Sequence, residues 1–190
     1  MPSYYNTLFV PLDIGKNVHW CAGYAGYDLT PVVEPFKVRS DQSGFERVTT
    51  VLDGLLTSGE YDRVVLGHEP TGIYHQAWSR ALYDRYAPYR TGQQQPQLDY
   101  QYLNPLLTKR QREQLSRGRK RKTDAADLRA IAFCLRDGQG QPAFLPTDQA
   151  VRFQLWGQAF NQTRRAVLRQ TVALISQLDR LWPGLVVNVQ

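Results

Sequence analysis

Cysteine is scarce in this sequence of 190 residues, which contains only Cys21 and Cys134. Two thiols are too few for a disulfide scaffold and lack the neighbours of a zinc site, so we expect two buried free thiols. Long apolar runs are also missing, because no stretch approaches the roughly 20 residues that cross a bilayer. The first residues lack the basic start and the apolar segment of a signal peptide. We therefore expect a cytoplasmic protein rather than a secreted or membrane protein.

Charge is distributed unevenly along the chain. Residues 109–122 contain eight basic residues and one acidic residue, whereas the rest of the sequence contains 15 basic and 16 acidic residues. The whole net charge of +6 therefore arises from one segment, which is typical of contact with nucleic-acid phosphates, although a solvated loop is the alternative. The basic residues expected to bind nucleic acid here are Lys109, Arg110, Arg112, Arg117, Arg119, Lys120, Arg121 and Lys122.

The hydrophobic pattern predicts an α/β protein. Residues 8–14 alternate in the manner of a strand buried on both faces, and a turn leads into a second strand that forms a hairpin with it. Pro11 cannot donate a hydrogen bond to a sheet and belongs at an edge or a bulge. Strands are predicted at 8–14, 18–25, 32–38 and 63–67, and helices at 43–56, capped by Ser43, and at 73–85.

The second half of the chain is less regular. Residues 87–101 have no clear period, and we expect a short strand around Tyr89 followed by a loop. A helix capped by Thr123 follows the basic segment, and a long helix is predicted over 147–182. Its heptad-like apolar seam packs on the first domain or pairs with a second copy of the chain, and we expect the latter. The predicted domains are 1–140 and 147–190, joined by a linker at 141–146.

Carboxylates occur where the active sites of α/β proteins form. Asp13 ends the first strand and Glu69 follows the fourth, and the carboxyl ends of parallel strands meet at one edge of a sheet. Asp124 and Asp127 are three residues apart and share one face of a helix. Four clustered carboxylates repel one another unless cations lie between them, and oxygen ligands select Mg²⁺ or Mn²⁺. Taken singly, each acid is also compatible with a turn or a helix cap.

Several motifs, in this order, resemble those of one protein family. They are Leu12-Asp13-Ile14-Gly15-Lys16, His68-Glu69-Pro70-Thr71-Gly72-Ile73-Tyr74-His75, Asn104-Pro105 and Lys122-Thr123-Asp124-Ala125-Ala126-Asp127-Leu128. In these motifs and their spacing the chain resembles the DEDD transposases of the insertion-sequence one-ten family. The resemblance implies a ribonuclease H-like (RuvC-like) mixed sheet flanked by helices, followed by a long helical, coiled-coil extension.

The same resemblance implies the chemistry and the partners. Family members are Mg²⁺-dependent recombinases of prokaryotic mobile elements, with Mn²⁺ as a substitute, and a structured bridge RNA guides them. The resemblance also implies that the catalytic metal ligands are Asp13, Glu69, Asp124 and Asp127. The family's attacking serine lies in a separate C-terminal domain that residues 1–190 do not include, so we expect this chain to supply the metal-binding half of the site. DNA, the guide RNA and further copies of the chain, as a dimer or a dimer of dimers, are the expected partners.

The residues alone leave two other functions open. A free-standing RuvC-like nuclease would use metal-activated water and would need no serine. A non-catalytic module for nucleic-acid binding and dimerisation would use the basic segment and the long helix, and would not depend on the carboxylates. In each case Lys16, one turn beyond Asp13, is a further candidate for phosphate binding.

Overall fold

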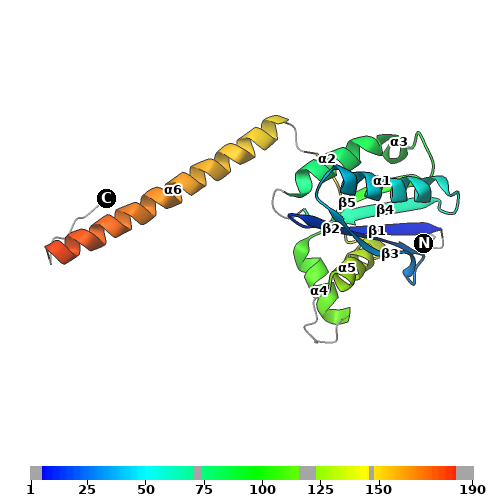
Figure 1. Ribbon diagram of the computed structural model, residues 1–190, viewed down its shortest axis with the longest axis horizontal. Helices are drawn as coiled ribbons and strands as arrows, with labels where there is room; N and C mark the ends of the chain where they lie inside the picture. Colours follow the sequence, from blue (N-terminus) through cyan, green and yellow to red (C-terminus); the bar gives the residue numbers. More distant parts are fainter. Residues whose placement is uncertain (1–5, 71–73, 116–122, 146–147, 183–190) are drawn as a thin grey trace. The chain divides into compact units, whose positions relative to one another are not determined.

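The computed structural model describes residues 6–70, 74–115, 123–145 and 148–182 (Figure 1). The chain divides into two compact units, Met1–Leu145 and Pro146–Gln190. Gln141 and Pro142 form the short strand β6, so the segment predicted as a linker begins inside the sheet of the first unit.

In the described part of the first unit, six strands form one mixed sheet with the order β3-β2-β1-β4-β5-β6. The strands are β1 (Thr7–Ile14), β2 (Val18–Ala25), β3 (Thr30–Arg39), β4 (Arg63–His68), β5 (Gln97–Tyr102) and β6 (Gln141–Pro142). The strands β1, β2 and β3 are joined antiparallel, β4 and β5 run parallel to β1, and β6 is antiparallel to β5. The strand β1 therefore lies inside the sheet, between its hairpin partner and β4.

Helices cover both faces of this sheet (Figure 1). On one face lie α1 (Gln42–Thr57), α2 (His75–Arg85) and α3 (Ala87–Arg90), and on the other lie α4 (Pro105–Leu115) and α5 (Asp124–Arg136). Because side chains alternate across a strand, β1 directs Leu8, Val10 and Leu12 into the core beneath α1 and α2, and Phe9 into the core beneath α5. Burial on both faces explains why β1 is almost entirely apolar.

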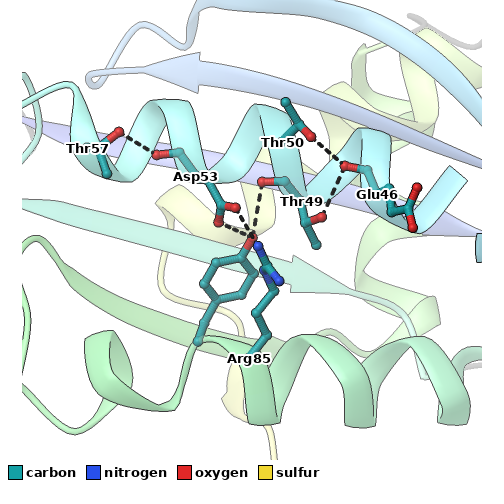
Figure 2. A network of polar contacts seen from close by, with 7 residues as sticks. Glu46, Thr49, Thr50, Asp53, Thr57 and Arg85 are labelled. Atoms are coloured by element: carbon teal, nitrogen blue, oxygen red, sulfur yellow. Dashed lines mark hydrogen bonds and ion pairs between the residues drawn. The ribbon is translucent and has the colours of Figure 1, made fainter. Parts of the chain in front are cut away.

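A polar network fastens α1 to the end of α2 (Figure 2). The Asp53 carboxylate accepts a hydrogen bond from the Tyr86 hydroxyl at 2.9 Å and pairs with the Arg85 guanidinium at 2.6 Å. The Tyr86 hydroxyl also lies 3.4 Å from the Thr49 carbonyl oxygen. The ion pair is partly exposed and contributes little by itself, so the buried Tyr86 ring supplies most of the stabilisation. The network holds α2, the helix that follows Glu69.

The predicted strands and helices up to α2 are confirmed, with ends that agree within two residues. The prediction of Ser43 as the cap of α1 was wrong, because the Asp41 carboxylate accepts a backbone N–H of the first turn at 3.0 Å. Pro11 is accommodated at an interior position of β1, where it pairs with Gly67 of β4 while the β1–β2 register passes over it. A missing N–H is tolerated there because no ladder bond to β2 depends on it.

The prediction for residues 87–101 was wrong in detail. Residues 87–90 form α3 rather than a strand near Tyr89, since Pro88 suits the first turn of a helix. The strand comes later, as β5, in which buried Leu98 and Tyr100 alternate with more polar and exposed residues. Two buried side chains in six residues are too weak a pattern to stand out in the sequence. The helix α4 was not predicted either.

The second unit contains α6 (Asp148–Leu181), which has 34 residues and is therefore about 50 Å long. The long helix predicted from the sequence is confirmed, and many of its apolar side chains are exposed within this chain, among them Trp156, Phe160 and Leu174. Together with the helix-flanked mixed sheet of the first unit, α6 confirms the predicted fold class. Among the helices of the described ranges, none is both long and apolar enough to span a membrane.

Candidate active site

Asp13 and Glu69 lie side by side at one edge of the sheet. The parallel register of β1 and β4 pairs Leu12 with His68, and the residue after each of them is an acid: Asp13 within β1 and Glu69 just beyond β4. Neighbouring strands lie about 4.8 Å apart, which brings the two backbones into contact range. Alternation places Asp13 on the same face of the sheet as Phe9, which packs beneath α5. The two strand ends therefore present carboxylates towards the layer of α4 and α5.

The other two acids lie in the first turn of α5. The Thr123 hydroxyl accepts the Ala126 N–H at 3.2 Å, as predicted for the cap of this helix. Asp127 is buried, with 5% of its side chain exposed, whereas Asp124 is exposed. Carboxylates are favourable near the N-terminus of a helix because the unpaired N–H groups carry positive charge. The same capped turn thus supplies one interior and one exposed carboxylate.

The helix α4 joins the strand-borne acid to the helix-borne acid. The Thr108 hydroxyl donates a hydrogen bond to the Glu69 carboxylate, and the Arg112 guanidinium forms an ion pair with Asp127. Thr108 and Arg112 are four residues apart and therefore lie on one face of α4, about 6 Å from each other. Glu69 and Asp127 consequently face the same stretch of helix, although they are far apart in the sequence.

A buried histidine supports Glu69 from the opposite face of the sheet. His68 is fully buried, and burial lowers its pKa to about 4, so its ring is neutral at pH 7. Its Nδ1 lies 3.0 Å from the Glu69 carbonyl oxygen, which can only accept, so Nδ1 carries the proton. Its Nε2, which has a single lone pair, then accepts a hydrogen bond from one of two hydroxyls that each lie 2.9 Å away, those of Ser79 and Tyr100. These contacts fix the backbone of Glu69 in place.

Glu69 also influences α5 through its charge. The pKa of the Cys134 thiol is raised to about 11, chiefly by burial and to a smaller extent by the nearby charges of Asp137 and Glu69. Cys134 is a buried residue of α5, so Glu69 lies near this helix. In the part of the chain that the structure describes, however, no three Asp, Glu, His or Cys side chains form a group that could share one metal ion. The contacts of α4 link Glu69 and Asp127, but no metal cluster is formed among the described residues.

The comparison with protein families gives one family model that matches the chain. A family model described as a transposase, for DEDD transposases of the IS110 (insertion-sequence one-ten) type, matches residues 10–183. The chain belongs to this transposase family. The match extends across both units, from the first strand to the end of α6.

One solved structure similar to this transposase is "T. thermophilus RuvC in complex with Holliday junction substrate". It shares 15% sequence identity and a TM-score of 0.44, and the match covers 72% of the transposase chain and 99% of the RuvC chain. No curated protein matches the transposase.

The basic residues of the transposase that were predicted to bind nucleic acid fall into three groups. Lys16 is exposed just beyond β1, and Lys109 and Arg110 are exposed on α4. Arg112 differs from them, because 27% of its side chain is exposed and its guanidinium is paired with Asp127. The remaining predicted residues, Arg117, Arg119, Lys120, Arg121 and Lys122, lie outside the described ranges.

Sequence reasoning missed two features of this transposase site. The first is α4, whose start is marked by Asn104 and Pro105: the Asn104 side chain accepts the Leu106 N–H at 2.9 Å, and proline is favoured in the first turn. This cap signal could have predicted the helix. The second is Thr108, for which the sequence carries no signal, because only the packing of α4 brings its hydroxyl to Glu69.

Proposed function

We propose that this transposase unit binds a divalent metal ion at the edge formed by Asp13, Glu69, Asp124 and Asp127, and that it cuts and rejoins the DNA strands of a mobile element. The observation that carries the proposal is that Asp13 and Glu69 each follow the last paired residues of parallel β1 and β4, Leu12 and His68. Asp127 is reached from Glu69 across one face of α4. In open α/β sheets, active sites form at this place.

The donor set fits a hard divalent ion in its chemistry. All four side chains offer carboxylate oxygens, which Mg²⁺ and Mn²⁺ prefer over nitrogen and sulfur. The buried Asp127 carboxylate already pairs with a cation, Arg112, because an unneutralised buried charge is costly. When bound, the ion supplies Lewis-acid stabilisation of charge on the phosphate oxygens. We take Mg²⁺ as the resident ion and Mn²⁺ as its substitute.

The protein's own residues have separate tasks in this proposal. Thr108 orients the Glu69 side chain and His68 holds its backbone, so that this acid is preorganised before the substrate arrives. Lys16, Lys109 and Arg110 are exposed and bind the DNA backbone without reading its sequence. The complete assembly, in the cytoplasm of a prokaryote, excludes water from the active site and aligns the two DNA strands.

We also propose the partners that the family resemblance implies. A structured guide RNA selects the DNA, and the basic residues offer it a phosphate-binding surface. A second copy of the chain, in a dimer or a dimer of dimers, pairs along α6, whose exposed Val167, Leu174 and Leu181 follow the heptad-like spacing. The attacking serine of strand transfer comes from a separate domain, as in the family that the chain resembles.

Titration of Mn²⁺ by calorimetry, in the presence of a short DNA duplex, tests the metal site. We expect binding to be lost in both Asp13→Asn and Asp124→Asn, because the two residues come from segments far apart and share only this site. Asp84→Asn, an exposed acid near the end of α2, is the matched control and should bind as the wild type does.

The outcomes separate the candidate functions. Equal heat in all variants, or none in any, would refute the metal site and favour a module that only binds nucleic acid. Metal binding together with cleavage of branched DNA by residues 1–190 alone would instead favour a nuclease that uses water as its nucleophile.

A further inference from the structure

Arg112 occupies a different environment from the other described basic residues of α4. Lys109 and Arg110 are exposed, whereas the Arg112 guanidinium reaches inward to the Asp127 carboxylate. Asp127 has only 5% of its side chain exposed, and a buried carboxylate is costly unless a positive charge or several hydrogen bonds compensate it. Arg112 is therefore part of how the acidic edge is stabilised in the absence of metal.

The position of Arg112 is coupled to Glu69 through the helix itself. Thr108 lies one turn before Arg112 and donates to the Glu69 carboxylate, so one face of α4 contacts two of the four acids. A divalent ion held by Glu69 and Asp127 would compete with the contacts that α4 makes with these two acids. Two cations cannot occupy one side of a buried carboxylate without strong repulsion.

From these contacts we propose that Arg112 is the resident counter-cation of Asp127, that the divalent ion displaces it on binding, and that the released guanidinium then binds a DNA phosphate. The inference rests on the proposed metal site and adds a positioning residue to it. A guanidinium binds phosphate with two parallel hydrogen bonds, and Lys109 and Arg110 on the same helix already face solvent. Metal and DNA therefore bind cooperatively, and each raises the affinity of the other by the same factor.

Removal of the Arg112 charge tests the displacement. In Arg112→Met, which keeps much of the side-chain volume, we expect Mn²⁺ to bind about tenfold more tightly than in the wild type when no DNA is present, a coupling of ordinary size. Arg110→Met removes a charge two residues away on the exposed side and is the matched control. It should change the affinity much less, which separates displacement from a general effect of net charge.

The cooperativity with DNA gives a second readout. In the wild type, Mg²⁺ should lower the Kd for a DNA duplex, and in Arg112→Met this effect should be reduced while it persists in Arg110→Met. An NMR measurement on the unmodified protein needs no variant to fold: the Arg112 Nε–H resonance should move from its ion-paired position during titration with Mg²⁺, at the midpoint that calorimetry gives for metal binding.

The failures of this inference and of the proposed metal site are distinguishable. If Asp13→Asn abolishes Mn²⁺ binding but Arg112→Met binds no more tightly than the wild type, and the Nε–H resonance does not move, the metal site stands and the displacement is refuted. If Arg112→Met does not fold, the resonance alone decides the matter. If the wild type binds no Mn²⁺ that depends on Asp13, both proposals are wrong.

Discussion

Acid should destabilise the first unit through one buried histidine. His68 is fully buried, and its pKa is lowered from the ordinary histidine value of 6.5 to about 4, chiefly by burial. In the unfolded chain the ring takes up a proton near pH 6.5, but in the folded protein it does so only near pH 4. The unfolded state therefore binds more protons between these values, and the stability that this group contributes is complete above pH 6.5 and is lost as the pH falls.

The size of this loss follows from the difference between the two pKa values. Each pKa unit corresponds to about 1.4 kcal/mol, so the full effect of His68 is about 3 kcal/mol between pH 6.5 and pH 4. Urea unfolding at several pH values in this range, for the wild type and for His68→Gln, measures it. Carboxylates also titrate below pH 5, but they do so in both proteins, so the difference between the two pH dependences isolates the histidine.

The result that would refute this reasoning is a parallel pair of curves. If the free energy of unfolding of His68→Gln falls with pH as steeply as that of the wild type, the imidazole is not held neutral by burial. A direct check is the NMR titration of the ring, which should remain neutral down to pH 5 in the folded protein. A signal that titrates near pH 6.5 would contradict the contacts of Nδ1 with the Glu69 carbonyl oxygen and of Nε2 with the two hydroxyls.

Two further predictions concern packing and thiol reactivity. Gly67→Ala should lower the free energy of unfolding by about 1–3 kcal/mol in urea, because its Cβ would lie 2.4 Å from Leu135 Cδ2, whereas Gly54→Ala, with open space around its Cβ, should leave stability equal or slightly higher. Cys21 and Cys134 should not react with an aromatic disulfide reagent at pH 8 while the protein is folded, since burial raises their pKa values to about 12 and about 11. Reaction of either thiol at the rate of a small free thiol would contradict their burial.

The parts of the fold that the sequence predicted are those whose burial is simple. The strand β1 is covered on both faces and so reads as a continuous apolar run, and α1 and α5 each bury one stripe against the sheet. The strand β5 was misplaced because its polar residues dilute a short pattern. A stretch of six residues with two buried side chains does not differ enough from a loop to be recognised.

The positions of Asp13 and Glu69 were predictable for a topological reason. Asp13 lies near the end of β1 and Glu69 lies just beyond β4; these two apolar strands run parallel, and parallel strands end at the same edge of a sheet. The sequence could therefore suggest that they meet without any knowledge of the helices. Asp127 required more, because its burial depends on how α5 packs, and the pattern of Asp124 and Asp127 is the same whether one, both or neither is interior.

The role of Arg112 could not be predicted from the sequence. Charge composition does not distinguish a basic residue that neutralises a buried carboxylate from one that faces a substrate. In the sequence, Arg112 is one of eight basic residues in a run, and all eight were assigned to nucleic acid. The packing of α4 against α5 gives the described members of this run two different environments. Arg112 forms an ion pair with the buried Asp127, whereas Lys109 and Arg110 are exposed. The number of basic residues in a run beside an acidic site is therefore larger than the number that can bind DNA. The difference is the number of buried carboxylates that these basic residues neutralise. A metal ion at those carboxylates would return that charge to the substrate-binding surface.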